Sequence, residues 1–268
     1  MPNLTVNVNK AKHNMTEKEK PNEFIQSFAN GLTLICAFDA EDSKMTLSEV
    51  AAKCDMTRAM ARRLLWTLEK LGYVENAGRL FFLKPKILEL GYAYLSSQRL
   101  IAVAQPIMER LAEQVQESCS MSVLDGLDIV YVLRIPTKRI MKISLGVGSR
   151  LPAWATSMGR VLLGVFSDAE LDTYFAQINP TNLTEHTITD KKKLKKIVTE
   201  TRKKGWVTVN QELELGLCSA AVPIFNSQGK IVAAINIGTP STSTAMDTLS
   251  NQYLPALQNA ATEIIRAL

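Results

Sequence analysis

Apolar residues recur every three or four positions in the first third of the chain, after a polar beginning. Residues 1–20 are rich in Asn, Lys, Glu and Thr and have no sustained period, which predicts a disordered tail. The next segment predicts a helix with five apolar residues on its buried face: Phe24, Phe28, Leu32, Ile35 and Phe38. A second short helix is predicted for "TLSEVAAKC", where Thr46 or Ser48 caps the first turn and Glu49 fits a capping box with Thr46.

A third helix follows the polar turn "DMT" and has two different faces. On a helical wheel the apolar residues that fall together are Ala61, Leu64, Leu65, Leu68 and Leu71. The residues that fall opposite are Arg58, Arg62, Arg63, Trp66 and Lys70. Gly72 ends this helix, and two short β-prone runs, Tyr73 to Glu75 and Leu80 to Leu83, predict a hairpin. Two short helices, a tight turn between them and a hairpin directly afterwards predict a winged helix-turn-helix.

The rest of the chain predicts a linker helix and then a domain of mixed helices and strands. A helical period continues over residues 86–115; its first part, 86–103, is the predicted linker helix, and Pro106 is expected to open or kink the next helix. Hairpins are predicted around Asp125-Gly126 and around Asn226 to Gly229. Between them lie a strand "MKISLGVG", a helix after "LPAWATSMGRVLLGVF", a helix near "SDAELDTYFAQ" and a basic helix from about Asp190 to Lys204. This mixture predicts an α+β ligand-binding domain.

These patterns divide the chain into a tail (1–20), a winged helix-turn-helix domain (21–85), a linker helix (86–103) and a ligand-binding domain (104–268). With 268 residues and 46% hydrophobic content, the chain is long enough to form a core in each domain. The sequence has no apolar run long enough for a membrane span, and its N-terminus lacks the apolar centre of a secretory signal. We therefore expect a cytoplasmic protein with no membrane partner.

The net charge of +5 suggests a polyanionic partner, and the distribution of charge indicates where it binds. The segment from Thr57 to Lys86 contains seven Lys and Arg residues but only two acidic residues, Glu69 and Glu75. An isolated basic helix is most often a solvated surface, but these charges lie on the second helix of a helix-turn-helix and on its wing. We therefore expect them to bind double-stranded DNA. The expected contacts are Arg58 and Arg62 to base edges, Thr46, Thr57 and Arg63 to phosphates, and Arg79 to a flanking groove.

A second basic run, "DKKKLKKIVTETRKKGW", is denser than the first. No turn-helix unit or wing surrounds it. One apolar stripe of Leu194, Ile197 and Val198 lies beneath its charged surface, which is typical of a solvated helix. Charge alone favours this run as the nucleic-acid site, whereas its context favours a solvent-exposed helix.

The loop "GVGSRLPAWATSMGRVLLGVF" is the longest unusual segment. Thr156 or Ser157 can cap the following helix, and the amides of Met158 and Gly159 are then expected to be free for an anion such as a carboxylate. A plain helix cap without a ligand is an equally good interpretation. Arg134 and Asn236 interrupt two apolar strands, where they either satisfy buried backbone groups or line a cavity and orient its ligand.

Features of an enzyme are lacking in the sequence. His13 and His186 have no evident nucleophile or metal partner, and no GxSxG, Walker or GxGxxG motif occurs. The four cysteines are far apart with no CxxC pair, so neither disulfides nor a zinc site are expected. We expect no catalysis, no metal and no cofactor.

Several motifs resemble the IclR family of bacterial transcriptional regulators: "TLSEVAAKCDMTRAMARRLLWTLEKLGYV", "LKPKILELGYAYLSS", "SRLPAWATSMGRVLLG" and "GWVTVNQELELGLCSAAVPIFNSQGKIVAAINI". The resemblance runs from about Phe24 to the C-terminus. "TRAMARRLL", "LGYAYLSS" and "RIPTKRIM" look most like the branch that controls aromatic-acid catabolism through the β-ketoadipate pathway. The resemblance implies a winged N-terminal domain, a linker helix, a GAF-like effector-binding domain and dimers that pair further on DNA. It also implies activation of transcription when the effector is bound.

The resemblance also implies an effector pocket formed by the "ATSMG" turn, the "GLCSAA" strand and the last strand, "AINIG". In this chain the corresponding residues are Thr156, Ser157, Met158, Gly159, Leu217, Cys218, Ser219, Ala220, Asn236 and Gly238. Family members that bind small keto acids carry a cysteine beside the second motif, and the aligned place here is nearer Ser219 than Cys218. From its strand position we add Arg134 as a carboxylate partner, and we add Met141 and Trp154 as apolar walls.

The leading hypothesis is a homodimeric or tetrameric transcription factor that recognises a repeated or palindromic operator and responds to a small aromatic carboxylate. Protocatechuate is the first expected effector, and 4-hydroxybenzoate and β-ketoadipate are its nearest competitors. The alternative from another class is a metabolite-binding protein or enzyme whose basic domain serves protein contacts.

Overall fold

The computed structural model describes residues 24–136, 145–242 and 245–268. The predicted disordered tail lies outside these residues. The chain forms two compact units, one ending at Ala93 and the other beginning at Tyr94. None of the helices in the described part of the chain has both the length and the apolar character needed to cross a membrane.

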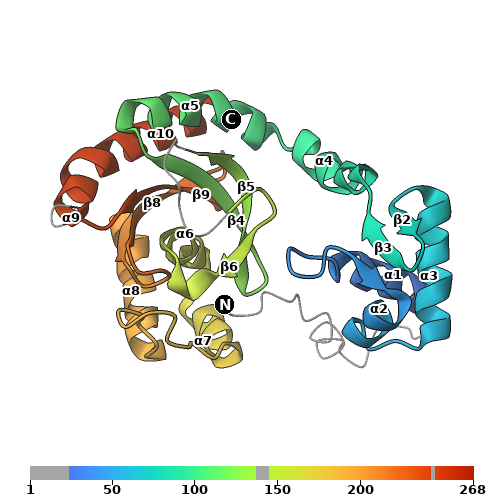
Figure 1. Ribbon diagram of the computed structural model, residues 1–268. Coiled ribbons are helices and arrows are strands. Elements are labelled where there is room, and N and C mark those ends of the chain that lie inside the picture. The colour runs from blue at the N-terminus through green and yellow to red at the C-terminus, as the bar shows by residue number, and fades with distance from the viewer. Residues whose placement is uncertain (1–23, 137–144, 243–244) are drawn as a thin grey trace. The chain divides into compact units, whose positions relative to one another are not determined.

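The first unit is a winged helix-turn-helix, as predicted (Figure 1). Its elements are α1 (Gln26–Cys36), β1 (Met45–Thr46), α2 (Leu47–Lys53), α3 (Arg58–Leu71), β2 (Val74–Ala77) and β3 (Leu80–Leu83). The three strands form an antiparallel sheet in the order β1-β3-β2. Strand β1 was not predicted, since two residues are too few to show an alternating pattern.

Local hydrogen bonds explain where these helices begin and end. The predicted capping box is present: the Glu49 amide donates to Thr46 Oγ1, and the Thr46 amide donates to Glu49 Oε2. Thr57 caps α3 by accepting from the Met60 amide at 3.2 Å. Gly72 ends α3 in the left-handed conformation, at a φ of 82°, which glycine adopts without steric cost.

Three of the five residues predicted for the buried face of the first helix are exposed, and so is one of the five predicted for that of α3. Phe24, Phe28 and Leu32 are exposed, Phe28 by 68%, and Leu34 is the buried side chain of α1. The physical reason is that an apolar period marks a face but does not say whether another element covers it. Leu71 is also exposed, by 54%, because it lies in the last turn of α3, beyond the buried Leu68.

The predicted linker segment is not one continuous helix. It contains a 3₁₀ turn (Pro85–Ile87), α4 (Leu88–Ser97) and the beginning of α5 (Arg99–Val115). Gln98 separates the two helices because its backbone is extended, at φ −96° and ψ 98°. Pro106 lies inside α5 and does not open it.

The second unit is built on a six-stranded antiparallel sheet in the order β6-β5-β4-β9-β8-β7. Its strands are β4 (Ser118–Asp125), β5 (Asp128–Ile135), β6 (Arg150–Pro152), β7 (Val207–Asn210), β8 (Leu217–Phe225) and β9 (Ile231–Pro240). Both predicted hairpins, β4–β5 and β8–β9, are confirmed. The predicted strand 141–148 is not found where it can be tested: 141–144 lie outside the described residues, 145–146 have no regular secondary structure, and 147–148 lie in a turn in which Gly148 has a φ of 88°.

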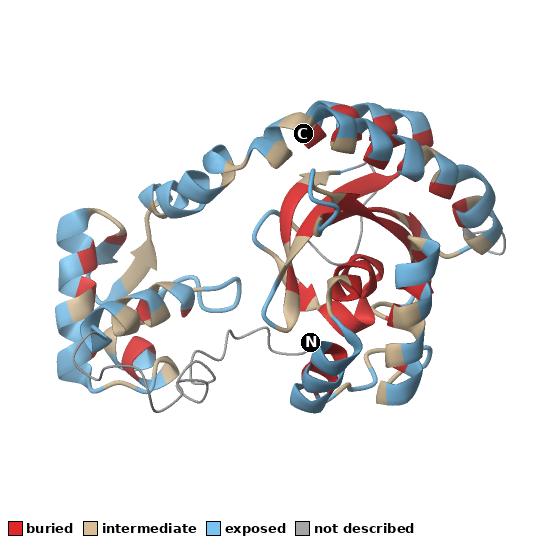
Figure 2. Ribbon diagram, turned by 180° about the vertical axis from the view of Figure 1, so that it is seen from behind, coloured by how far each residue is buried: buried red, intermediate tan, exposed pale blue. Residues whose placement is uncertain are grey.

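Helices cover both faces of this sheet, and most of its central residues are therefore buried (Figures 1 and 2). One face packs on α5 and on α10 (Leu254–Ala267), a helix that was not predicted; α9 (Ala245–Thr248) precedes it. The other face packs on α6 (Ser157–Leu162), with α7 (Asp168–Gln177) and α8 (Lys191–Lys204) outside it. Helix α6 and the short 3₁₀ turn before it (Ala153–Ala155) are thus held against the inner face of the sheet.

Candidate DNA-binding surface and effector pocket

Helix α3 presents its arginines to solvent. Arg58, Arg62 and Arg63 are exposed, while Ala61 and Leu65 on the opposite side are fully buried. Within the described residues, these three arginines take part in no ion pair. Thr57 caps the same helix, so the beginning of α3 combines a fixed backbone with three available guanidinium groups. This arrangement suits binding to phosphates and to guanine edges.

The other predicted DNA contacts flank this helix. Arg79 follows Gly78 in the two-residue turn of the β2–β3 hairpin and is exposed. Lys84, on the same wing, pairs with Glu75 at 3.7 Å. The hydroxyl oxygens of Thr46 and Thr57 accept from helix amides. Each hydroxyl still has a proton to donate, so a capping role and a phosphate contact are compatible.

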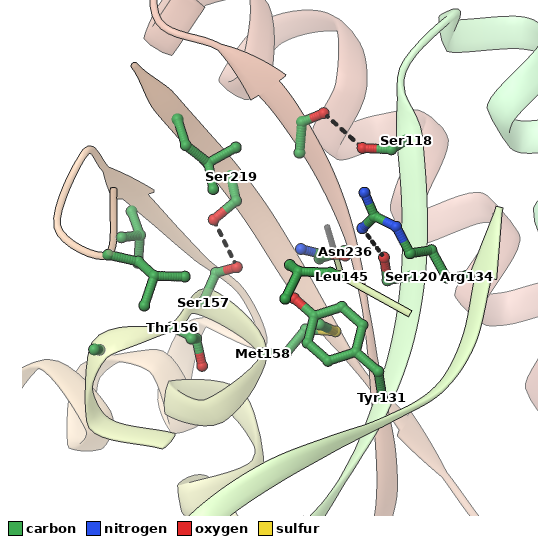
Figure 3. Close-up of a pocket in the computed structure, with 15 residues that line it drawn as sticks. Ser118, Ser120, Tyr131, Arg134, Leu145, Thr156, Ser157, Met158, Ser219 and Asn236 are labelled. Carbon is green, nitrogen blue, oxygen red and sulfur yellow. Dashed lines mark hydrogen bonds between the residues drawn. The ribbon is translucent and has the colours of Figure 1, made fainter. Parts of the chain in front are cut away.

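A pocket lies between the inner face of the six-stranded sheet and the turn that leads into α6 (Figure 3). The cavity that its side chains enclose has a volume of about 40 Å³. It is lined by Ser118, Ser120, Tyr131, Arg134, Leu145, Ala155, Thr156, Ser157, Met158, Val209, Leu213, Leu217, Ser219, Asn236 and Gly238. Small-molecule sites are typically about 300–1,000 Å³, so binding of a small ligand requires the lining side chains to move apart.

Strand pairing brings the polar lining residues together. Ser120 on β4 is paired with Arg134 on β5 and with Asn236 on β9. A β-bulge between Met121 and Ser122 changes the alternation of side chains on β5. Tyr131 and Arg134 therefore both face the pocket although they are an odd number of residues apart. The tyrosine was missed because simple alternation from Arg134 excludes it.

The turn into α6 is held by hydrogen bonds of its own. Thr156 Oγ1 accepts from the Gly159 amide at 3.0 Å, and Ser219 Oγ donates to Ser157 Oγ at 2.8 Å. The expectation that the Gly159 amide is free for an anion is therefore wrong. Two of the lining residues are thereby tied together from opposite walls, Ser157 from α6 and Ser219 from β8.

Arg134 alone carries a charge among the described residues that line the pocket. Its Nη1 donates to Ser120 Oγ at 3.3 Å. Burial raises the pKa of Tyr131 to about 12, so its phenol is neutral and acts as a hydrogen-bond donor and acceptor. The pocket therefore combines one cation with hydroxyl and amide groups, a set that matches an anionic ligand carrying polar substituents.

The remaining predicted residues do not line this pocket. Cys218 and Ala220 alternate with Leu217 and Ser219 on β8 and pack on the opposite face of the sheet, under α5 and α10. Trp154 is buried in the core beside α6. Gly159 packs against backbone: a Cβ there would lie 2.1 Å from the Ala153 carbonyl oxygen. Met141 lies outside the described residues.

Two further lining residues could have been predicted from the alternation of side chains along their strand. Ser118 and Ser120 are small polar residues at alternate positions of β4, which places both on one face of the strand. The remaining missed residues have no such pattern: Leu145, Ala155, Val209 and Leu213. They come from loops and a sheet edge whose positions depend on the whole fold.

A buried ion pair lies behind the pocket wall. Arg160 on α6 is 1% exposed and binds Glu212 through two hydrogen bonds, of 2.8 and 2.6 Å. Its Nε donates to the Trp154 carbonyl at 3.1 Å. Glu212 Oε2 also accepts from the Ile188 amide at 3.2 Å. The pair therefore joins α6 to the segment that carries Leu213, another lining residue.

An exposed basic helix with a wing in one unit, and a pocket lined by one arginine and several hydroxyl groups in the other, define a ligand-responsive DNA-binding regulator. Residues 27–78 match the IclR helix-turn-helix domain, and residues 92–266 match the bacterial transcriptional regulator IclR C-terminal domain. The chain belongs to the IclR family of transcriptional regulators. Its relatives are regulators and not enzymes.

Three relatives match most of the chain. The Pca regulon regulatory protein of Pseudomonas putida is 39% identical over 92% of this chain and 85% of its own length. The Pca operon regulatory protein of Acinetobacter baylyi is 34% identical over 98% and 97%. The p-hydroxybenzoate hydroxylase transcriptional activator of the same organism is 33% identical over 93% and 94%.

Solved structures agree with this assignment. A protein from a Rhodococcus species has a TM-score of 0.83 and 48% identity, covering 91% of this chain and 98% of its own. The inducer-binding domain of the PobR transcription factor from Acinetobacter, a double mutant solved with 3-hydroxybenzoic acid, has a TM-score of 0.58 and 32% identity. That comparison covers 62% of this chain and 98% of the domain.

Proposed function

We propose that the chain is a cytoplasmic regulator, and specifically an activator, of aromatic-acid catabolism that binds an aromatic carboxylate. Protocatechuate is the first choice, and 4-hydroxybenzoate and β-ketoadipate are the competitors. The observation that carries this proposal is the pocket, in which one guanidinium, from Arg134, is combined with several hydroxyl groups. The names of the three relatives and the hydroxybenzoate held by the PobR domain support an aromatic hydroxy acid.

The proposed DNA partner is a double-stranded operator with a repeated or palindromic sequence. We assign Arg58 and Arg62 to base edges, Thr46, Thr57 and Arg63 to phosphates, and Arg79 to a flanking groove. The denser basic helix α8 is a weaker candidate because some of its charges are used within the domain. Lys195 pairs with Asp172, and Arg202 pairs with Asp168.

We further propose a homodimer that can pair into a tetramer. Apolar residues of the first unit that are exposed in the single chain support this oligomer: Phe24, Ile25, Phe28 and Leu32. An effector changes transcription only if it binds one arrangement of the dimer better than another. The segment 86–103 connects the DNA-binding and effector domains and is the proposed route for this coupling.

Changing Arg62 to Ala is expected to weaken operator binding by about 1–3 kcal/mol, because we assign its side chain to a base edge, and to leave the fold intact, because the side chain is exposed. Fluorescence anisotropy with promoter and random duplexes, over a series of salt concentrations, measures this change. The matched control is Lys203→Ala, which removes an exposed charge from α8. An unchanged operator footprint for Arg62→Ala contradicts the assignment, and equal affinity for both duplexes without salt dependence contradicts DNA recognition itself.

Changing Arg134 to Ala is expected to weaken protocatechuate binding by about 1.5–3 kcal/mol, the range for a hydrogen bond to a charged group. Ser157→Ala is expected to weaken it less, because its hydroxyl is neutral. Calorimetry of the full chain with protocatechuate, 4-hydroxybenzoate and β-ketoadipate measures both effects and ranks the three effectors. Wild-type affinity in both variants removes the proposed carboxylate site.

A further inference from the structure

Asn236 has an unsatisfied polar atom inside the pocket. The residue is 9% exposed, and its Oδ1 is buried with no hydrogen-bond partner. Among the described residues, no other buried side-chain nitrogen or oxygen is left in this state. A buried carbonyl without a partner is unfavourable because it has lost its hydrogen bonds to water. A molecule that enters the pocket can supply the missing partner.

The position of Asn236 relative to Arg134 follows from strand pairing. Both residues are paired with Ser120, so the three lie in one row across β5, β4 and β9. Neighbouring strands are about 4.8 Å apart, which places the backbones of Arg134 and Asn236 about 10 Å apart. Figure 3 shows Arg134 on one side of Asn236, with Ser157 and Ser219 on the other. A flat ring held by its carboxylate at Arg134 can therefore extend toward Asn236.

The amide of Asn236 is matched best by a hydroxyl group. An asparagine offers one acceptor oxygen and two N–H donors, and rotation about its last side-chain bond exchanges them. A phenolic hydroxyl both donates and accepts, so it pairs with either orientation of the amide. A second carboxylate only accepts, and a ring C–H group does neither. The chemistry of Asn236 thus selects a hydroxylated ring over an unsubstituted one.

We propose that Asn236 determines effector specificity by hydrogen bonding a ring hydroxyl of the aromatic acid whose carboxylate binds Arg134. This inference rests on the proposed function, which supplies the aromatic carboxylate. It adds the residue that distinguishes hydroxybenzoates from benzoate. The discrimination comes from the ligand that lacks the hydroxyl, since that ligand leaves the Asn236 carbonyl buried and unpaired.

The test is calorimetry of the full chain with protocatechuate and with benzoate. The wild-type protein is expected to bind protocatechuate about tenfold to a hundredfold more tightly than benzoate. In Asn236→Ala this ratio is expected to fall by about fivefold or more, through weaker protocatechuate binding and unchanged benzoate binding. The control is Arg134→Ala, in which both ligands weaken by the same factor and the ratio stays at its wild-type value.

The outcomes separate this inference from the proposed function. If the wild-type protein binds both acids equally, or if Asn236→Ala keeps the wild-type ratio, the role of Asn236 is overturned and the aromatic-acid effector stands. If the wild-type protein binds neither acid, the proposed effector class fails and this inference fails with it. Retained benzoate affinity in Asn236→Ala shows that the variant is folded. The comparison of protocatechuate with benzoate on the wild-type protein tests the inference without any variant.

Discussion

Replacing Arg160 with methionine is expected to lower the free energy of unfolding of the effector domain by about 3–5 kcal/mol. The change leaves the Glu212 carboxylate buried without its cation, and it also removes the hydrogen bond to the Trp154 carbonyl. Urea unfolding followed by tryptophan fluorescence measures the loss. Trp154 becomes the single reporter of this region when Trp66 and Trp206 are changed to phenylalanine.

The matched control is the double variant Arg160→Met/Glu212→Leu. It removes both charges together, so no ion is left buried without a partner, and it is expected to recover most of the lost stability. A loss of less than about 1 kcal/mol for Arg160→Met alone contradicts the prediction, because that is the range of an exposed ion pair. A double variant that is less stable than Arg160→Met also contradicts it.

Changing Gly159 to Ala is expected to destabilise the effector domain by about 3 kcal/mol, at the upper end of the usual range for overpacking, and to abolish effector binding. The new Cβ would lie 2.1 Å from the Ala153 carbonyl oxygen and 2.4 Å from its Cα. Both atoms belong to the backbone, so α6 has to move away from the preceding turn. That movement displaces Ser157 and Met158, which line the pocket. Thermal unfolding and calorimetry with protocatechuate measure the two effects.

Gly164→Ala is the control for this prediction. Its Cβ would meet the Ile231 side chain at 3.7 Å and Arg202 Cβ at 3.8 Å, which are ordinary contacts. The change is expected to alter stability by less than about 1 kcal/mol and to leave effector binding intact. If the two alanine variants behave alike, the close packing of Gly159 on Ala153 is not what holds the pocket wall.

The first unit was largely predictable because its signals are local. The capping box of Thr46 and Glu49, the cap at Thr57 and the stop at Gly72 each depend on groups a few positions apart in the chain. Which side of α1 is buried could not be predicted, because that depends on what covers the helix. Phe28 satisfies the helical period and is nonetheless exposed.

The effector pocket was predictable in part, and the errors have physical causes. From the "GLCSAA" motif, four consecutive strand residues were predicted to line the pocket, but only alternate residues of a strand face the same side. Leu217 and Ser219 therefore line the pocket, and Cys218 does not. Tyr131 could not be paired with Arg134 because the β-bulge in the β4–β5 ladder is not visible in the sequence. That Asn236 Oδ1 is buried without a hydrogen-bond partner could not be predicted, because it depends on the three-dimensional packing around the residue.

The two faces of the central sheet have a consequence for how new regulators arise within such a family. Ser118, Ser120, Ser219 and Gly238 occupy the pocket side of three adjacent strands and are all small. The shape of the cavity is therefore set by side chains that are easily enlarged or exchanged. The hydrophobic core under α5 and α10 is built from the alternating residues on the other side. Ligand preference can thus diverge by single substitutions that leave the folding core untouched, which also makes these four positions the first choice for a library aimed at new aromatic inducers.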